Sequence, residues 1–316
     1  MVYAALEATD KMFNERENIM ISTLKHMLSG ARLAIIGHEN SDFDSVASGV
    51  LLASFLNFCG IKARFLIPDG FDCYAEKYLP LFGIYPDEYC GKPFEDEFLF
   101  LVDCHTTIYP NKVLGCIDHH PTSRKNDYPF YMNSPSSSCT LSVLRLSEKG
   151  GAVLTENDYA MTAMSIYMDT QSLKSSKLVP SDLDWLSETV RKYRLDCGFM
   201  IRCGYCMTDL DKTVDELSVN ELKKYDYSGV AVWCSVIRHN EIQPELKRRI
   251  ISAVEEKREK CDAALWIIIF TNPEKEISEV VRITSEQTEC RSYGRILSRS
   301  IDVMPVIEKE ISDGSI

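Results

Sequence analysis

The chain has 316 residues, of which 45% are hydrophobic and 26% are charged, as is typical of a soluble globular protein of about two domains. Its formal net charge of −12 argues against binding to long duplex nucleic acid, because such affinity comes largely from Lys and Arg side chains that neutralise phosphates. A small anionic substrate remains compatible with this charge if a bound divalent cation makes the site locally positive.

Predicted helices and strands alternate through the first part of the chain. An amphipathic helix over 8–28 is followed by an apolar strand at 32–37. Further strands are predicted at 63–67, 98–102 and 113–117, and helices at 46–58, 74–81, 140–148, 156–167 and 181–193. This alternation predicts an α/β domain, with a parallel sheet and helices on both of its faces.

The pattern weakens after Arg194, where a helical stretch at 213–224 is predicted to belong to a connector. A smaller α/β domain follows, with predicted strands at 229–237, 263–270 and 279–284 and a charged helix at 245–260. We therefore expect a catalytic domain over 1–194, a helical connector over 195–225, and a substrate-binding domain over 226–316 across a cleft.

Acidic and imidazole side chains follow three of the predicted strands directly. The carboxyl ends of parallel strands meet at one edge of a sheet, where open α/β sheets bind their ligands, so we expect these side chains to cluster. Four of the six histidines of the chain lie in these three segments. The clustered side chains are His38, Asp42, Asp44, Asp103, Asp118, His119 and His120.

Helix capping is the alternative explanation for individual members of this group, such as Asp44 before the helix at 46–58. Capping does not explain acids and histidines at three strand ends together, so the joint pattern favours a metal site. Mixed imidazole and carboxylate donors suit Mn²⁺, with Mg²⁺ or Co²⁺ as alternatives. The absence of cysteine from this cluster argues against a structural zinc site. The donors outnumber the needs of one ion, which predicts a pair of divalent ions that activates a water molecule.

These motifs resemble those of the DHH phosphoesterases, which are named for the run found here at 118–120. The first family motif is similar to 38–45, with Ser41 where the family often has proline, and the second is similar to 101–103. A fourth motif resembles 167–170, and the order and spacing fit over about the first 190 residues. The resemblance thus implies the DHH fold and a phosphoric ester hydrolase.

The resemblance also implies a division of the cluster between two ions. His38, Asp42 and Asp103 would hold one ion, and Asp103 would bridge to the other. The remaining ligands of the second ion would be Asp44, His119 and Asp169. Outside the ligand set, His120 would contact the substrate phosphate as an acid or electrostatic stabiliser, and Asp118 would orient the site.

In length and layout the chain looks most similar to the bacterial oligoribonuclease and pAp phosphatase (NrnA-like) branch of the family. That branch implies a substrate such as a short oligoribonucleotide or 3′-phosphoadenosine 5′-phosphate (pAp), and a homodimer is an assembly it could form. Inorganic pyrophosphatase and cyclic or linear dinucleotide phosphodiesterase are alternative activities. A nucleotide-binding sensor is the alternative without catalysis.

Substrate contacts are harder to assign. Ser138 and Thr140 lie before a predicted helix and could contact phosphate or simply cap that helix, while Arg282 and Arg299 could contact phosphate or form part of a solvated surface. The sequence after Val303 does not contain the glycine-rich loop ending in histidine with which the family binds a nucleotide.

The apolar run at 263–270 is much shorter than the roughly 20 residues that span a bilayer. Acidic residues such as Glu7 and Asp10 stand where a signal peptide would be basic and then apolar. We expect a cytoplasmic protein with no membrane partner, in which most of the twelve cysteines are reduced thiols.

Overall fold

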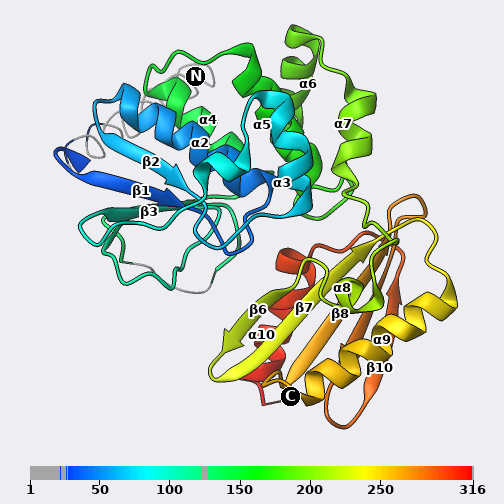
Figure 1. Cartoon of the computed structure of the whole chain (residues 1–316). Coiled ribbons are helices and arrows are strands. Elements are labelled where there is room, and N and C mark those ends of the chain that lie inside the picture. Colours follow the sequence, from blue (N-terminus) through cyan, green and yellow to red (C-terminus); the bar gives the residue numbers. More distant parts are fainter. Residues whose placement is uncertain (1–21, 23–25, 27, 123–126, 315–316) are drawn as a thin grey trace, which may run out of the picture. The chain divides into compact units, whose positions relative to one another are not determined.

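The computed structural model describes residues 22, 26, 28–122 and 127–314, which fold into two compact units (Figure 1). The first unit contains the described residues up to Asp169 together with Val179–Cys197, and the second contains Thr170–Leu178 and the described residues from Gly198 onward. The helix predicted over 8–28 lies almost wholly outside the described residues. The functional labels of the three predicted domains stay predictions.

A parallel sheet forms the centre of the first unit, with the strand order β2-β1-β3-β4-β5. Its middle strands are apolar on both faces and almost fully buried, as is typical of parallel sheets covered by other elements. The strands are β1 (Arg32–Ile36), β2 (Lys62–Leu66), β3 (Phe98–Val102), β4 (Val113–Asp118) and β5 (Phe130–Asn133).

The strand order reverses between β1 and β3. The chain runs from β1 outward to β2 and then returns to place β3 on the other side of β1. In open α/β sheets, ligands bind beyond the carboxyl ends of the strands at such a switch point. The loops that follow β1 and β3 therefore occupy the position where this fold binds ligands.

Helix α2 (Phe43–Phe58) packs against β1, β2 and β3 and also against α4 and α5. It begins at Asp42, whose side chain accepts a hydrogen bond from the backbone N–H of Ser45 at 3.0 Å. The other helices of this unit are α3 (Cys73–Tyr78), α4 (Cys139–Lys149), α5 (Glu156–Asp169) and α6 (Asp182–Tyr193), with short 3₁₀ turns at Leu79–Phe82 and Pro86–Tyr89.

The second unit is built on a mixed sheet with the strand order β10-β9-β8-β7-β6, in which only β7 and β8 run parallel. Its strands are β6 (Lys223–Tyr227), β7 (Val230–Arg238), β8 (Leu265–Asn272), β9 (Ile277–Ile283) and β10 (Thr288–Tyr293). Its helices are α7 (Cys197–Gly204, which starts at the end of the first unit), α8 (Val214–Ser218), α9 (Pro244–Glu259) and α10 (Met304–Ser312), the last preceded by a π turn at Arg299–Val303.

The central strand β8 of this second sheet is buried on both faces. Alternate residues of β8 point to opposite sides: Ile267 packs with Ile307 of α10, whereas Ile268 packs with Ile250 of α9. The long apolar run around β8 is thus explained by a strand with helices on both sides rather than by a membrane segment. The predicted architecture, an α/β domain with a parallel sheet followed by a second α/β domain, is confirmed.

One predicted element is wrong in part. The helix expected at 213–224 ends at Ser218, and the chain turns into β6, which forms an antiparallel hairpin with β7. Ser228 and Gly229, which connect the two strands, both have positive φ, as a two-residue hairpin turn requires. The sequence analysis also did not predict β5, β10 or α10.

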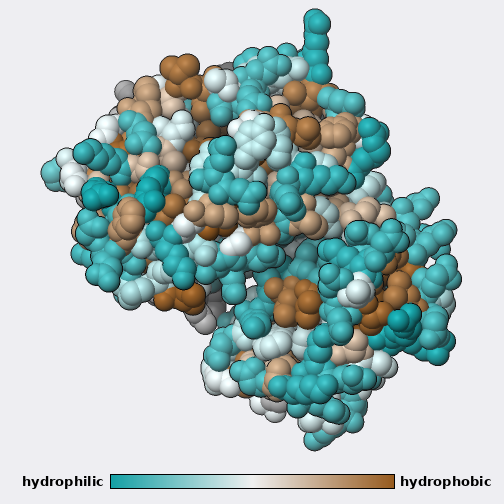
Figure 2. Space-filling view, viewed as in Figure 1, coloured by the Kyte–Doolittle hydropathy of each residue, from teal (hydrophilic) through white to brown (hydrophobic). Residues whose placement is uncertain are grey.

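Hydrophilic residues cover most of the face shown in Figure 2, and apolar residues lie between them in smaller groups. Within the described part of the chain, every helix is too short or too polar to cross a membrane. All twelve cysteines are free thiols, as predicted for most of them.

The pairing of β3 with β4 depends on Gly115, which lies opposite the fully buried Phe100. A methyl group at Gly115 would come within 2.2 Å of the Phe100 ring. We expect Gly115→Ala to lower the free energy of unfolding by about 1–3 kcal/mol, because an overfilled core must move its side chains or backbone. Chemical denaturation would measure this, with Gly294→Ala as the control, since a methyl group there meets nothing within 4 Å. Equal effects of the two substitutions would contradict the prediction.

Candidate metal centre

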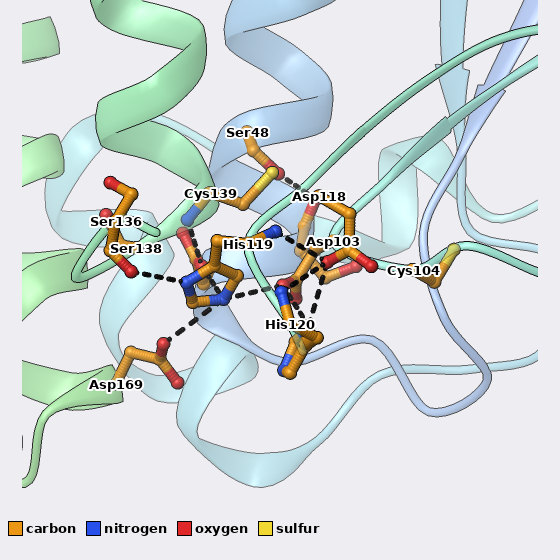
Figure 3. Close-up of polar contacts among 12 residues, drawn as sticks. Ser48, Asp103, Cys104, Asp118, His119, His120, Ser136, Ser138, Cys139 and Asp169 are labelled. Atoms are coloured by element: carbon orange, nitrogen blue, oxygen red, sulfur yellow. Dashed lines mark hydrogen bonds and ion pairs between the residues drawn. The ribbon is translucent and has the colours of Figure 1, made fainter. Parts of the chain in front are cut away.

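The predicted donor side chains meet at the carboxyl ends of three strands of the parallel sheet. His38 follows β1, Asp103 follows β3, and His119 follows β4. Asp42 and Asp44 stand at the start of α2, and Asp169 is the last residue of α5. Figure 3 shows the ring of His119 between Asp169 on one side and Asp103 on the other.

Three candidate donor groups adjoin one another. One joins His120 to Asp103 and His119, with His120 Nδ1 3.6 Å from Asp103 Oδ1, and the other two contain the six predicted ligands. In the first of these two, His38 Nε2 lies 3.2 Å from Asp42 Oδ2 and 3.4 Å from Asp103 Oδ2. In the second, His119 Nε2 lies 3.2 Å from Asp103 Oδ1, 3.6 Å from Asp44 Oδ2 and 3.4 Å from Asp169 Oδ2. Asp103 therefore directs one carboxylate oxygen into each of these two groups, as a carboxylate that bridges two cations would.

Hydrogen bonds to backbone carbonyls fix the orientation of both imidazoles. The Nδ1 atom of His119 lies 2.8 Å from the carbonyl oxygen of Ser136, and that of His38 lies 2.8 Å from the carbonyl oxygen of Glu39. Because a carbonyl oxygen can only accept a hydrogen bond, each Nδ1 carries a proton. In the neutral ring, Nε2 then carries a lone pair. Nε2 faces carboxylate oxygens in both cases. Lone pairs that face carboxylates at this distance repel one another unless a cation binds between them, so the arrangement fits a metal ion.

Asp44 is held by four hydrogen bonds from two helices. It accepts from the backbone N–H groups of Cys139 at 2.7 Å and Thr140 at 2.9 Å, and from the hydroxyls of Thr140 and Ser165, both at 2.6 Å. Burial, followed by the charge of Asp103, raises the pKa of Asp44 to about 7. A nearby cation would therefore favour the charged form of Asp44.

Asp103 has a left-handed backbone conformation, with φ of 56°. This conformation is uncommon for residues other than glycine, although Asp tolerates it better than most, and such strain is frequent at functional sites. The backbone N–H of Asp103 donates to the carbonyl of Ile117 on the neighbouring strand at 3.0 Å. Burial opposes the charged form of Asp103. When the rings of His119 and His38 are protonated at Nε2 as well, they donate hydrogen bonds to Asp103 that outweigh burial and lower its pKa.

Asp118 is buried, and its side chain binds the two residues that follow it in the sequence. Its Oδ1 accepts from the backbone N–H groups of His119 at 2.8 Å and His120 at 3.2 Å, and lies 2.9 Å from His120 Nδ1. Burial acts against its charge, but hydrogen bonds from His105 and His120 outweigh burial and hold the pKa of Asp118 well below its usual range. Asp118 therefore acts as an acceptor that orients other groups.

The donor chemistry fits a hard or intermediate divalent ion. The candidate groups among the described residues are composed of histidine and aspartate alone. Cys139 lies close by, but burial raises the pKa of its thiol well above the usual value, and Sγ donates to the carbonyl of Ile117 at 3.4 Å. A protonated thiol is not a metal ligand, so the site favours Mn²⁺ or Mg²⁺ over thiolate-bound zinc.

The residues predicted to contact substrate have other partners. Ser138 is buried and caps α4 by accepting from the backbone N–H of Leu141, and the hydroxyl of Thr140 donates to Asp44. In the second unit, Arg282 pairs with Glu310 at 2.7 Å, and Arg299 donates to the carbonyl of Glu221 at 2.5 Å. A substrate role for these four residues stays a prediction.

Sequence reasoning missed several groups that support the donors. His105 binds Asp118, Ser136 binds His119 through its carbonyl, and Ser165 binds Asp44. His105 had a recognisable signal, since it lies two residues after Asp103 at the end of a strand. Ser165 had none, because a serine inside a helix is common on any face.

Comparison with known proteins matches part of the first unit to a family. Residues 32–166 match the family described as the DHH family, N-terminal domain. This part of the chain is therefore a DHH domain, and the class predicted from the sequence, a DHH phosphoesterase, is confirmed.

Relatives and a solved structure match most of the chain. It is 23% identical over 305 residues to the manganese-dependent inorganic pyrophosphatase of Methanothrix thermoacetophila, covering 87% of this chain and 96% of the relative. It is 24% identical over 317 residues to the probable manganese-dependent inorganic pyrophosphatase of Bacillus velezensis, covering 89% and 99%. Its fold is similar to the crystal structure of the putative family II inorganic pyrophosphatase of Methanococcus jannaschii, with a TM-score of 0.72, 20% identity and coverage of 88% and 98%. The names of these relatives describe them as manganese-dependent, and the donor groups of this chain suit the divalent metal predicted from the sequence.

Substitutions at Asp103 and His120 should affect metal binding differently. Asp103 contributes to both groups that contain the predicted ligands, so Asp103→Ala should abolish tight binding of Mn²⁺. His120 bonds through Nδ1 to Asp118, so His120→Ala should retain the metal. Isothermal titration with Mn²⁺ would give the affinity and the number of sites for each variant. Retention of tight binding by Asp103→Ala would show that the centre is misplaced.

The hydroxyl of Thr140 should influence the second ion through Asp44. We expect Thr140→Val, which removes the 2.6 Å hydrogen bond, to weaken Mn²⁺ binding by about 10- to 100-fold, as loss of a group that orients a ligand typically does. Thr162→Val is a matched control, because Thr162 is equally buried but donates to the carbonyl of Asp158. The same loss of affinity in both variants would point to general destabilisation instead.

Proposed function

We propose that the protein is a metal-dependent inorganic pyrophosphatase. The observation that carries the proposal is the position of Asp103, which directs its two oxygens into adjoining donor groups and so suits a pair of ions. Curated relatives with this name align with 87% and 89% of the chain, a share that extends far beyond the DHH domain. This function was the second choice from the sequence, and the length of these alignments raises it to first.

Hydrolysis of pyrophosphate requires attack of water on one phosphorus, breakage of the bond to the bridging oxygen, and transfer of a proton to the phosphate that leaves. When bound, two divalent ions supply positive charge for the attacking water and for the phosphoryl oxygens. The candidate ligands of these ions are His38, Asp42, Asp103, Asp44, His119 and Asp169.

The protein's own contribution to the chemistry centres on His120. Its Nδ1 proton bonds to Asp118, which orients the ring and leaves Nε2 as the atom that can meet a phosphoryl oxygen. Asp118 binds the backbone of His119 as well, so one carboxylate orients a metal ligand and the substrate-facing histidine together. His120 is thus proposed to contact the substrate, and Asp118 is proposed to position the ring of His120.

Short oligoribonucleotides and pAp, the first choice from the sequence, remain predictions. A cytoplasmic location and a homodimer also remain predictions.

A substrate screen would test the proposed function. Purified protein loaded with Mn²⁺, Mg²⁺ or Co²⁺ would be given pyrophosphate, pAp, a dinucleotide RNA and a cyclic dinucleotide, and phosphate or nucleotide release would be measured. We expect pyrophosphate to have the highest kcat/KM, with Mn²⁺ the best cofactor. His120→Ala should lose at least about 100-fold in kcat, the range typical of general acid and base groups, while retaining the metal.

Two outcomes would contradict the proposal. Faster turnover of pAp or dinucleotide RNA than of pyrophosphate would restore the nuclease and pAp phosphatase assignment. Nucleotide binding without turnover of any substrate would favour the sensor.

A further inference from the structure

The two oxygens of the buried Asp118 carboxylate have separate partners. Oδ1 binds the backbone of His119 and His120 and the Nδ1 atom of His120. In the described part of the chain, Oδ2 has one partner, the Nδ1 atom of His105 at 3.0 Å. The side chain of Asp118 is inaccessible to solvent, so water does not replace a missing donor.

His105 is itself held in place from two directions. It lies two residues after Asp103 in the loop that follows β3, and Asp118 ends β4, the strand paired with β3. Tyr128 donates from its hydroxyl to the carbonyl oxygen of His105 at 3.0 Å, which anchors the backbone of the loop. The side chain of His105 is one quarter exposed, whereas its contact atom faces the buried carboxylate.

We infer that His105 is a positioning residue that acts through Asp118 on His120. A carboxylate bound at both oxygens cannot rotate about its Cβ–Cγ bond without breaking a hydrogen bond at each end. With Oδ2 held by His105, Oδ1 stays directed at His120 Nδ1, and this keeps the proton on that nitrogen and Nε2 toward the substrate. The three residues form a chain of hydrogen bonds from the loop after β3 to the proposed substrate contact.

The effect of losing His105 is specific to turnover. His105→Leu removes the donor to Oδ2 and lets Asp118 turn, so kcat should fall by about 10- to 100-fold, as is typical when a group that orients an active-site residue is lost. KM should stay close to the unmodified value and Mn²⁺ should still bind, because every candidate metal ligand is retained and the ring of His119 is still held by the carbonyl oxygen of Ser136. His105→Asn should recover most of kcat, because its amide N–H can replace the Nδ1–H donor. His239→Leu, in the second unit, is the control for loss of a histidine.

A double-mutant cycle separates positioning from a general structural role. In a His120→Ala background, His105→Leu should cause little further loss, because the residue through which it acts is gone. The inference is overturned if His105→Leu lowers kcat by the same factor in both backgrounds, or if it removes the metal.

This inference rests on the proposed role of His120 in the hydrolysis, so one measurement must not depend on substrate. Nitrogen NMR of Mg²⁺-loaded protein reports which ring nitrogen of His120 carries the proton. We expect the Nδ1–H form in the unmodified protein and in His105→Asn, and a mixture of tautomers in His105→Leu. An unchanged His120 spectrum in His105→Leu overturns the inference. If pyrophosphate is not hydrolysed while the spectra change as expected, the proposed function fails and the positioning role stands.

Discussion

The repulsion among buried carboxylates is the constraint on which the rest of the site depends. Asp44 and Asp103 are almost fully buried and close to Asp42 and Asp169, and their mutual repulsion and burial disfavour charge at Asp44. Unpaired buried charges cost several kcal/mol each, so such a group persists only with strong compensation. The imidazole lone pairs that face these carboxylates add to the repulsion. Divalent cations between the donors would offset both the repulsion among the carboxylates and the repulsion between carboxylates and imidazole lone pairs. The arrangement therefore fits a metal centre.

The fold supplies this compensation through rigid elements. Strand ends position His38, Asp103 and His119, and the start of α4 gives two backbone N–H groups to Asp44. Backbone carbonyls, rather than mobile side chains, set the tautomers of both candidate histidine ligands. Ligands held in this way need little rearrangement when an ion binds, and the geometry of a bound pair of ions is then determined by the sheet edge.

The sequence predicted those site residues that directly follow apolar strands, because strands and the residues at their ends can be recognised from the local pattern. Apolar strands ending in acids and histidines placed His38, Asp103 and His119 at one sheet edge, since parallel strands share their direction. The resemblance to the DHH family was needed for Asp169, which locally is only the last residue of a helix. Contacts between distant elements, such as Ser165 with Asp44, follow from packing and leave no mark in the sequence. Strand β5 has four residues and the hairpin strand β6 has five, which is too short for a recognisable alternation of apolar and polar residues.

Asp169 also connects the metal centre with the path of the chain. It is the last residue of α5 and of the first of the two segments that make up the first unit, and Thr170 begins a short segment assigned to the second unit. The next turn has positive φ at Gln171, Ser172 and Leu173, which costs about 1–3 kcal/mol for each such residue. Thr170 stabilises the turn by accepting from the backbone N–H of Leu173 at its hydroxyl. A strained turn directly after Asp169, closed by this hydrogen bond, fixes the end of α5, so the backbone that carries the Asp169 carboxylate is already held in place at the candidate metal centre.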